Sequence, residues 1–326
     1  MDLYPVLFEP VYKQMVWGGG RLGELYGRRL PFEKTGESWD LSCRRDGTGI
    51  IENGPLAGIS FDEFMDMDRE AVLGKKLADL ARFPMLIKII DASDDLSVQV
   101  HPDDGYALTH NEPDTGKNEI WYVMEPPDSG YLIIGLKDGV DRKALGEAIL
   151  NGNVGDCLNR LPVRRGDAVD IPAGLVHALT KGAVVAEVQQ NSDLTYRLYD
   201  YGRVGIDGKA RKLRIEDALG VIDFAGAIPK KTIDASRLGH NGAATWRILS
   251  SNYFDVRKYA LDGMISENSD PDFFFAFTCV EGRVEIKSKT FSVGVPASRT
   301  VFIPAAMGAY EIRGRGVLIK SAAVQS

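Results

Sequence analysis

The sequence is poor in the residues that build disulfide scaffolds, membrane spans and secretion signals. Its only cysteines among 326 residues are Cys43, Cys157 and Cys279. They are odd in number and far apart, so we expect neither a disulfide framework nor a cysteine-based metal site. No apolar run approaches the roughly 20 residues that a membrane helix needs. The start has no basic region followed by an apolar run, so we expect no signal peptide and a cytoplasmic protein.

Basic residues are also in the minority, with 39 Lys and Arg against 46 Asp and Glu, a formal net charge of -7. A nucleic-acid surface needs clustered Lys and Arg, so we expect no nucleic-acid partner, and no membrane partner either. Local basic patches still leave room for a small anionic substrate. The length and the 44% of hydrophobic residues predict a large core, divided into two units or extended by an insertion.

Short strand-like segments separated by Gly, Pro and Asp turns dominate the chain, a pattern typical of a sandwich or barrel. In the first part they are Phe83–Ile90, Leu96–His101, Ile120–Met124, Tyr131–Leu136, Ala168–Ile171 and Ala183–Gln189. Beyond about residue 240 they are Thr245–Leu261, Phe273–Val280, Gly282–Ile286 and Thr300–Ile303. We therefore predict a mainly β protein.

Helical patterns are few. The capping-box sequence Ser60-Phe-Asp-Glu63 predicts a helix that runs to about Leu77, and Asp141–Leu150 predicts a second helix.

Two nine-residue segments have a similar pattern: Arg165–Ala173 and Ala297–Ala305 both end in Ile-Pro-Ala after an apolar run. The similarity is either a weak internal repeat or an accident. A true repeat would mean two related barrels, of which only the first keeps polar ligands.

The strand predicted at residues 96–101 has one polar face. Side chains alternate along a strand, so Gln99 and His101 point to one side, opposite Val98 and Val100. A half-solvated strand has the same pattern, but two good metal donors side by side also suit a metal site.

Two more donors stand in predicted strands or turns. Glu119 shares a strand face with Lys117 and Trp121, and His177 follows the Pro172-Ala-Gly174 turn, where the backbone has little freedom. Together with Gln99 and His101 they offer imidazole, carboxylate and amide oxygen. Such a mixed set suits zinc, iron or another divalent ion, and leaves a position for water or substrate.

The spacing Gly-x5-Pro-x-Gly-x2-His at Gly166–His177 resembles the second motif of cupins, which are small β-barrel metalloproteins. The first cupin motif normally carries His-x-His, whereas this chain has Gln99-Val-His101 and a distant Glu119. Gln-x-His-Pro-Asp followed by Gly116–Tyr122 (Gly-Lys-Asn-Glu-Ile-Trp-Tyr) resembles type I mannose-6-phosphate isomerases.

Further segments resemble the same family: Trp17–Gly19, Gly36–Trp39, Phe83–Lys88 and Asp94–Pro102. The resemblance covers most of residues 10–203 and implies the short bacterial form. It implies two cupin-like (jelly-roll) β-barrels with a few helices. We expect a catalytic cupin domain with helical insertions at 1–240, and a degenerate cupin-like domain without metal ligands at 241–326.

The resemblance implies one divalent ion per chain, zinc, and assigns roles by position. The implied metal ligands are Gln99, His101, Glu119 and His177. The implied catalytic residues are Lys117, Glu187 and Arg197, and the implied substrate-binding residues are Ser97, Lys88 and Arg203. At position 203 other members carry Lys, so the charge is kept while the geometry of anion binding differs.

The implied activity belongs to carbohydrate metabolism: mannose 6-phosphate and fructose 6-phosphate are interconverted through an enediol. Glu187 is a candidate base for the proton transfer, with a metal-bound water and His101 as rivals. Lys117, Arg197 and Arg203 are candidates for binding the phosphate.

Two other functions fit parts of the pattern. Two histidines and one carboxylate are also the ligands of non-haem iron oxygenases. The barrel could instead bind a sugar phosphate without turning it over. The oligomeric state, monomer or homodimer, stays open.

Overall fold

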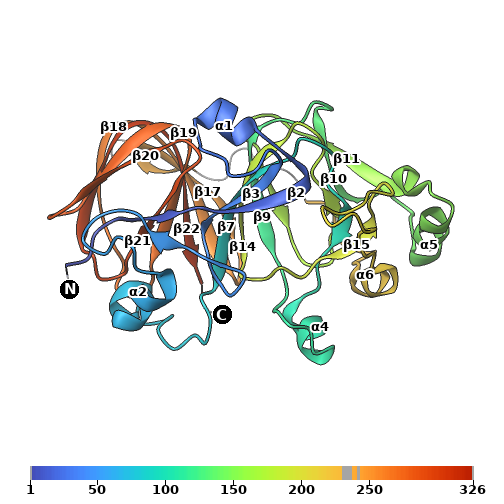
Figure 1. Ribbon diagram of the computed structural model, residues 1–326, viewed down its shortest axis with the longest axis horizontal. Coiled ribbons are helices and arrows are strands. Elements are labelled where there is room, and N and C mark those ends of the chain that lie inside the picture. Colours follow the sequence, from blue (N-terminus) through green and yellow to red (C-terminus); the bar gives the residue numbers. More distant parts are fainter. Residues whose placement is uncertain (1, 230–236, 241–242, 325–326) are drawn as a thin grey trace. The chain divides into compact units, whose positions relative to one another are not determined.

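The computed structural model describes residues 2–229, 237–240 and 243–324 (Figure 1). Strands dominate this part of the chain, which confirms the predicted fold class, and the helices are short. The helices are α1 (Arg21–Tyr26), α2 (Phe61–Met67), α3 (Arg69–Leu73), α4 (Asp104–Thr109), α5 (Arg142–Leu150), α6 (Ile215–Val221) and the 3-10 helix η1 (Val154–Cys157). Among the described residues, no helix is both long and apolar enough to cross a membrane.

The strands of the first part of the chain lie between residues 6 and 162. These strands are β1 (Val6–Glu9), β2 (Val11–Gly19), β3 (Thr35–Leu41), β4 (Cys43–Arg44), β5 (Gly47–Thr48), β6 (Ile50–Ile51), β7 (Met85–Asp91), β8 (Val98–Val100), β9 (Glu119–Glu125), β10 (Tyr131–Leu136) and β11 (Leu158–Pro162). The others are β12 (Ala168–Ile171), β13 (His177–Ala178), β14 (Val184–Gln190), β15 (Tyr196–Tyr199), β16 (Arg237–His240), β17 (Ala243–Ser250), β18 (Phe254–Asn268), β19 (Phe275–Lys287), β20 (Ser292–Pro296), β21 (Thr300–Ile303) and β22 (Ala309–Ala323).

The chain forms two compact units, each built from separate stretches of sequence. Unit 1 comprises Met1–Val11, Ser38–Ile89 and Thr232–Ser326, and unit 2 comprises Tyr12–Glu37 and Ile90–Lys231. The predicted division at residue 240 is contiguous in sequence, and it stays a prediction.

Unit 2 places the polar strands of the sequence next to one another. Its five-stranded sheet has the order β11-β10-β13-β8-β15, so β8 lies between two neighbours. Gln99 on β8 faces His177 on β13 and Arg197 on β15 across these strand pairs. Three residues far apart in sequence therefore share one region of the sheet.

A second group of strands in unit 2 has β9 between β12 and β14. Glu119 on β9 lies opposite Gln189 on β14, and Trp121 lies opposite Glu187. Every residue of β14 is buried, so its polar side chains must find partners inside the protein.

Helices α5 and α6 cover the five-stranded sheet with their apolar residues (Figure 1). Leu145 of α5 and Leu219 of α6 join a cluster that includes Val98 and Tyr196 of the sheet. Leu145 is completely buried, which contributes about 2 kcal/mol to stability. This packing fixes β8 and β15, the strands that carry Gln99 and Arg197.

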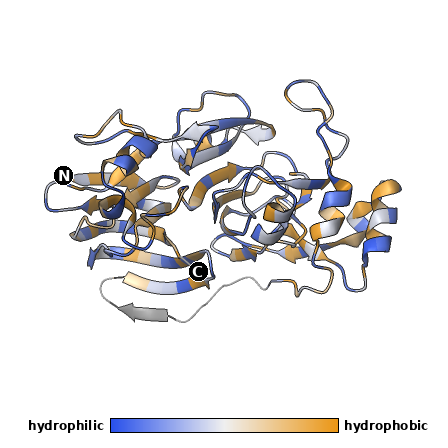
Figure 2. Ribbon diagram, turned by 90° about the horizontal axis from the view of Figure 1, so that it is seen from below, coloured by the Kyte–Doolittle hydropathy of each residue, from blue (hydrophilic) through white to orange (hydrophobic). Residues whose placement is uncertain are grey.

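Unit 1 is built on a nine-stranded antiparallel sheet in which β18, β22 and β19 are neighbours (Figure 1). Strands β18 and β22 pair from Phe254 opposite Ala323 to Asn268 opposite Ala309. Apolar and polar residues alternate along these strands, which Figure 2 shows as changes of colour. The alternation places one face in the core, as the sequence pattern predicts.

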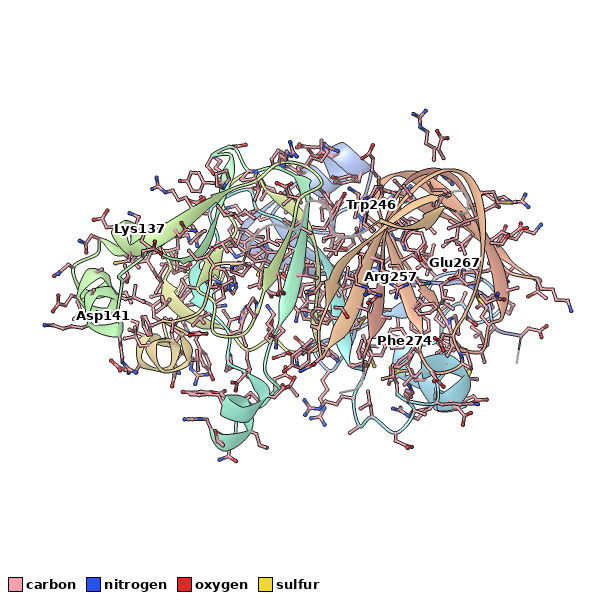
Figure 3. All side chains as sticks on the ribbon, turned by 180° about the vertical axis from the view of Figure 1, so that it is seen from behind. Lys137, Asp141, Trp246, Arg257, Glu267 and Phe274 are labelled. Carbon is pink, nitrogen blue, oxygen red and sulfur yellow. The ribbon has the colours of Figure 1, made fainter. Side chains whose placement is uncertain are left out.

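Unit 1 contains a half-buried charged pair, Glu267 and Lys320, whose side chains are 19% and 12% exposed. Glu267, labelled in Figure 3, accepts hydrogen bonds from Lys320 at 2.7 Å and from the Tyr310 hydroxyl at 2.9 Å. The Lys320 ammonium also lies 3.8 Å from the ring centroid of Phe275. These contacts satisfy both charges, so we interpret the pair as structural.

Three predicted elements differ from the structure. The helix predicted from Ser60 to Leu77 is two helices, because Asp68 has extended backbone angles and its carboxylate caps α3 by accepting from the Ala71 N–H. The run Thr245–Leu261 is wrong as one strand, because a turn at Ser251–Tyr253 separates β17 from β18. The run Gly282–Ile286 and all but the first two residues of the run Phe273–Val280, conversely, belong to the single strand β19.

Candidate metal centre

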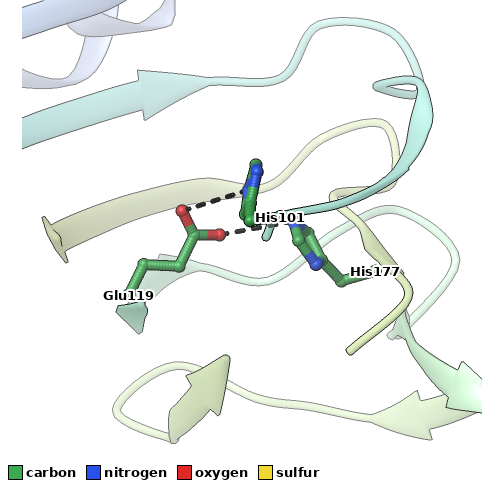
Figure 4. Close-up of side chains that lie close together, drawn as sticks. All are labelled: His101, Glu119 and His177. Atoms are coloured by element: carbon green, nitrogen blue, oxygen red, sulfur yellow. Dashed lines mark ion pairs between the residues drawn. The ribbon is translucent and has the colours of Figure 1, made fainter. Parts of the chain in front are cut away.

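The side chains of His101, Glu119 and His177 converge inside unit 2 (Figure 4). Their ligand atoms all lie within 4.8 Å of one another, and the three side chains are at most 1% exposed. His101 Nε2 lies 3.6 Å from Glu119 Oε2, and His177 Nε2 lies 3.4 Å from Glu119 Oε1. The structure thus brings together three of the four predicted ligands around one point.

Each imidazole is oriented by a backbone carbonyl. His101 Nδ1 donates a hydrogen bond to the Leu194 carbonyl at 2.7 Å, and His177 Nδ1 donates to the Leu175 carbonyl at 2.8 Å. A carbonyl can only accept, so the proton of each neutral ring is on Nδ1. The lone pair of each Nε2 is then directed at Glu119, which is the arrangement found in metal-binding histidines.

Burial keeps both imidazoles neutral. It lowers the pKa of His101 to about 3, with the Lys117 charge acting in the same direction, and it also lowers the pKa of His177. Burial opposes the ionisation of Glu119, but the Lys117 charge holds its pKa well below the usual range. The centre therefore presents two uncharged nitrogen donors and one carboxylate at neutral pH.

This donor set fits a cation. Both Glu119 oxygens are fully buried and have no hydrogen-bond partner among the described residues, although Lys117 forms an ion pair with Oε2 at 2.7 Å. On the side away from Lys117, His177 Nε2 and Glu119 Oε1 face each other at 3.4 Å with no proton between them, which is unfavourable unless a positive charge lies there. A divalent ion would satisfy all three groups.

Gln99 completes the predicted ligand set. Its amide nitrogen lies 3.3 Å from His177 Nε2. A half-turn of the amide would present its oxygen instead, the atom with which glutamine binds a cation. The structure therefore places all four predicted ligands at the same site.

Lys117 and Glu187 lie beside the ligands. Lys117 Nζ is 3.2 Å from His101 Nε2 and 3.8 Å from Glu187 Oε1. Glu187 Oε2 accepts a hydrogen bond from the Trp121 indole N–H at 3.0 Å, which fixes the orientation of the carboxylate. The Glu187 carboxylate therefore lies beside His101, Glu119 and His177 but is not one of the three converging side chains.

The other predicted site residues have different surroundings. Arg197 belongs to the strand next to Gln99, and its Nε atom is buried without a hydrogen-bond partner among the described residues. Ser97 is buried two residues before Gln99. Arg203 pairs with Asp200, and Lys88 belongs to unit 1, where its ammonium lies 5.5 Å from the Trp39 ring centroid.

Gln189 is a buried polar residue that the sequence reasoning missed. It lies opposite Glu119 on β14, and its amide nitrogen donates to the carbonyls of Gln190 and Ser192. Its amide oxygen is buried and has no partner in the described part of the chain. The signal was present, because Gln189 is two residues after Glu187 and shares its strand face.

Models of two known domain families match parts of the chain. Residues 6–120 match the model of the family "Phosphomannose isomerase type I, catalytic domain", and residues 245–323 match "Mannose-6-phosphate isomerase, cupin domain". The chain is 35% identical to the probable mannose-6-phosphate isomerase GmuF of Bacillus subtilis, over 95% of this chain and 96% of that protein. It is 33% identical to the mannose-6-phosphate isomerase of Streptococcus mutans, over 89% of each chain.

The fold is also that of a solved relative. The crystal structure of the mannose 6-phosphate isomerase from Bacillus subtilis superposes with a TM-score of 0.89 at 32% identity. The match covers 98% of this chain and 99% of that one. The similarity therefore extends through both the strands of the metal centre and the C-terminal sheet, which has the cupin-type fold.

Proposed function

The chain belongs to the type I mannose-6-phosphate isomerases, and from this we propose that its metal centre interconverts mannose 6-phosphate and fructose 6-phosphate through an enediol. The observation that carries the proposal is the position of Lys117, 2.7 Å from the ligand carboxylate of Glu119 and 3.8 Å from the second carboxylate of Glu187. Isomerisation needs such a combination: a cation site, a base and a group that neutralises charge on oxygen.

Gln99, His101, Glu119 and His177 hold one divalent ion, and we propose zinc, because two imidazoles with a carboxylate and an amide oxygen form a mixed site that zinc accepts. When bound, the ion polarises a sugar oxygen and so acidifies the proton on the neighbouring carbon.

Glu187 is the proposed base that moves the proton between C1 and C2. The Trp121 indole holds Oε2, so Oε1, on the side of Lys117, receives the proton and returns it to the other carbon. His101 is a poorer base because its Nε2 is directed at Glu119 as a ligand. Lys117 and Arg197 donate hydrogen bonds to the sugar oxygens as negative charge develops on them.

Ser97, Lys88 and Arg203 are the proposed substrate-binding residues. Their cationic groups and hydroxyl suit a phosphorylated sugar, since guanidinium and ammonium groups form charge-assisted hydrogen bonds with phosphate.

A coupled assay on zinc-loaded protein tests the proposal, with conversion of mannose 6-phosphate to fructose 6-phosphate as the readout. We expect turnover that a chelator abolishes and zinc restores. A zinc-replete protein with no turnover would refute the isomerase function. Oxygen consumption by the iron-loaded protein, measured in parallel, would support an oxygenase instead.

A further inference from the structure

Two arginines share one buried carboxylate in unit 2. Arg203 Nη2 lies 2.6 Å from Asp200 Oδ1, and Arg211 Nη1 lies 2.9 Å from the same oxygen. The Asp200 side chain is only 4% exposed, and those of Arg203 and Arg211 are 15% and 16% exposed. Arg203 also forms an ion pair with Asp94 at 3.7 Å, but the Asp94 side chain is 60% exposed, so Asp200 is the buried anion that the two arginines share.

The two arginines stand at the two ends of one short loop. Val204 and Ala210 form an isolated antiparallel bridge, and the Gly205 N–H donates to the Lys209 carbonyl. Arg203 and Arg211 immediately flank this bridge. Because both bind Asp200, the loop and the carboxylate together fix their guanidinium groups.

The two guanidinium groups differ in how many donors they use. Arg203 donates from Nε to the Asp200 carbonyl at 3.3 Å, from Nη2 to the Asp200 carboxylate, and from Nη1 to the Asp95 carbonyl. Arg211 uses only Nη1, on Asp200. Within the described residues its Nε and Nη2 have no hydrogen-bond partner. These two nitrogens form one edge of the guanidinium group, and this edge can bind a phosphate through two parallel hydrogen bonds.

The third arginine connects this pair with the metal centre. Arg197 lies opposite the ligand Gln99 on the neighbouring strand. The Arg214 N–H donates to the Arg197 carbonyl at 3.0 Å, so the segment that follows Arg211 lies beside this strand. In keeping with this, burial lowers the pKa of Arg211 and the Arg197 charge lowers it further. The carboxylates of Asp200, Asp94 and Glu37 lie among these arginines, so the case for a phosphate rests on the unused donors of Arg211 and not on net charge.

On the basis of the proposed function, we propose that Arg211 binds the phosphate of the sugar substrate through its Nε–Nη2 edge, while Asp200 and Arg203 position it. Arg211 is then a substrate-binding residue that the sequence motifs did not indicate. Arg203 keeps its proposed place at the substrate, and its three nitrogens, which all contact the protein, also hold Asp200 and the loop.

The test compares two ligands, mannose 6-phosphate and mannose, which differ only in the phosphate group. Thermal unfolding of the zinc-loaded parent, Arg211→Met and Lys209→Met is followed with mannose 6-phosphate and with mannose. Lys209 is a matched control because it is an exposed cation of the same loop. We expect mannose 6-phosphate to stabilise the parent and Lys209→Met far more than mannose does, and Arg211→Met to lose most of this difference.

Steady-state kinetics give a second readout. Because two charge-assisted hydrogen bonds are lost, we expect Arg211→Met to raise KM for mannose 6-phosphate about 10- to 100-fold while kcat changes less than about threefold. Arg211→Lys keeps the positive charge but lacks the planar guanidinium group, so its KM should lie between those of the parent and Arg211→Met. It also keeps the test decisive if the methionine variant does not fold.

Asp200→Asn separates positioning from charge. The substitution increases the net positive charge, so a purely electrostatic role for Asp200 predicts tighter binding of mannose 6-phosphate. Positioning of the arginines predicts weaker binding, which is our expectation.

An Arg211→Met or Arg211→Lys protein with the parent's preference for mannose 6-phosphate over mannose would overturn the assignment. A parent that binds mannose 6-phosphate preferentially but does not isomerise it would refute only the proposed function. In that case, loss of the preference in Arg211→Met would still support Arg211 as the residue that binds the phosphate.

Discussion

The Nε2 atom of His177 and the side-chain amide of Gln99 face each other at 3.3 Å across the pairing of β8 with β13. The Leu175 carbonyl holds the proton of His177 on Nδ1, so this Nε2 has a free lone pair. Two strands that are 78 residues apart in sequence thereby place an amide and an imidazole at one metal centre.

This pairing makes Gln99→Leu a direct test of the fourth ligand. Leucine keeps the volume but offers no oxygen, so we expect metal affinity to fall by at least about tenfold while the fold is retained. Zinc bound per chain at graded concentrations of a competing chelator measures the effect. Gln14→Leu, an exposed glutamine of the same unit, is the control. Equal zinc affinity in Gln99→Leu and the parent would exclude Gln99 as a ligand.

Metal removal should lower stability. The ion binds the folded ligand set and has no such set in the unfolded chain, so binding adds about 4 kcal/mol at a free ion concentration 1,000 times its Kd. Thermal unfolding with zinc and with a chelator measures the difference. We expect Glu119→Gln, which loses the charged ligand, to show little dependence on zinc. A parent whose Tm is the same with and without chelator would argue against the site.

Glu187→Gln should separate catalysis from binding. The amide keeps the shape and can still meet the Trp121 indole, but it cannot accept the proton, so we expect kcat to fall by about two to four powers of ten. KM and bound zinc should stay within a few-fold of the parent, because Glu187 is not in the ligand set. Glu147→Gln, on the exposed face of α5, is the control. A normal kcat in Glu187→Gln would show that another group acts as the base.

Asp170 on β12 should make stability depend on pH. Burial raises its pKa from 3.8 to about 6, although the Ile171 N–H opposes this shift. Since the folded protein binds this proton more tightly than the unfolded chain, the contribution of Asp170 to stability falls as pH rises from about 4 to 6 and is constant above that range.

We therefore expect Asp170→Asn to be more stable than the parent at pH 7, by at most about 3 kcal/mol, and equally stable near pH 4. Urea unfolding at both pH values measures this, with the exposed Asp138→Asn as control. A gain of the same size at pH 4 and pH 7 would show that titration of Asp170 is not the cause.

The sequence by itself determined the mainly β fold, and it predicted the four side chains that the structure brings together as candidate metal ligands. Strand alternation puts Gln99 and His101 on one side of a six-residue run, and the Pro172-Ala-Gly174 turn restricts the backbone before His177. These are local signals, since each depends on residues within one strand or turn. The family motifs then connected the local signals with Glu119.

Only the tertiary structure decided which partners orient these groups. His101 meets the Leu194 carbonyl, 93 residues away in sequence, and any residue type could supply that carbonyl. Arg203 and Arg211 look alike in the sequence, yet Asp200 and Asp95 use every side-chain nitrogen of Arg203, and Asp200 uses only one of Arg211. Such differences depend on which distant strands and loops lie next to each other. Alternation of polar and apolar residues shows which face of a strand a side chain is on, but not which strand or loop is its neighbour.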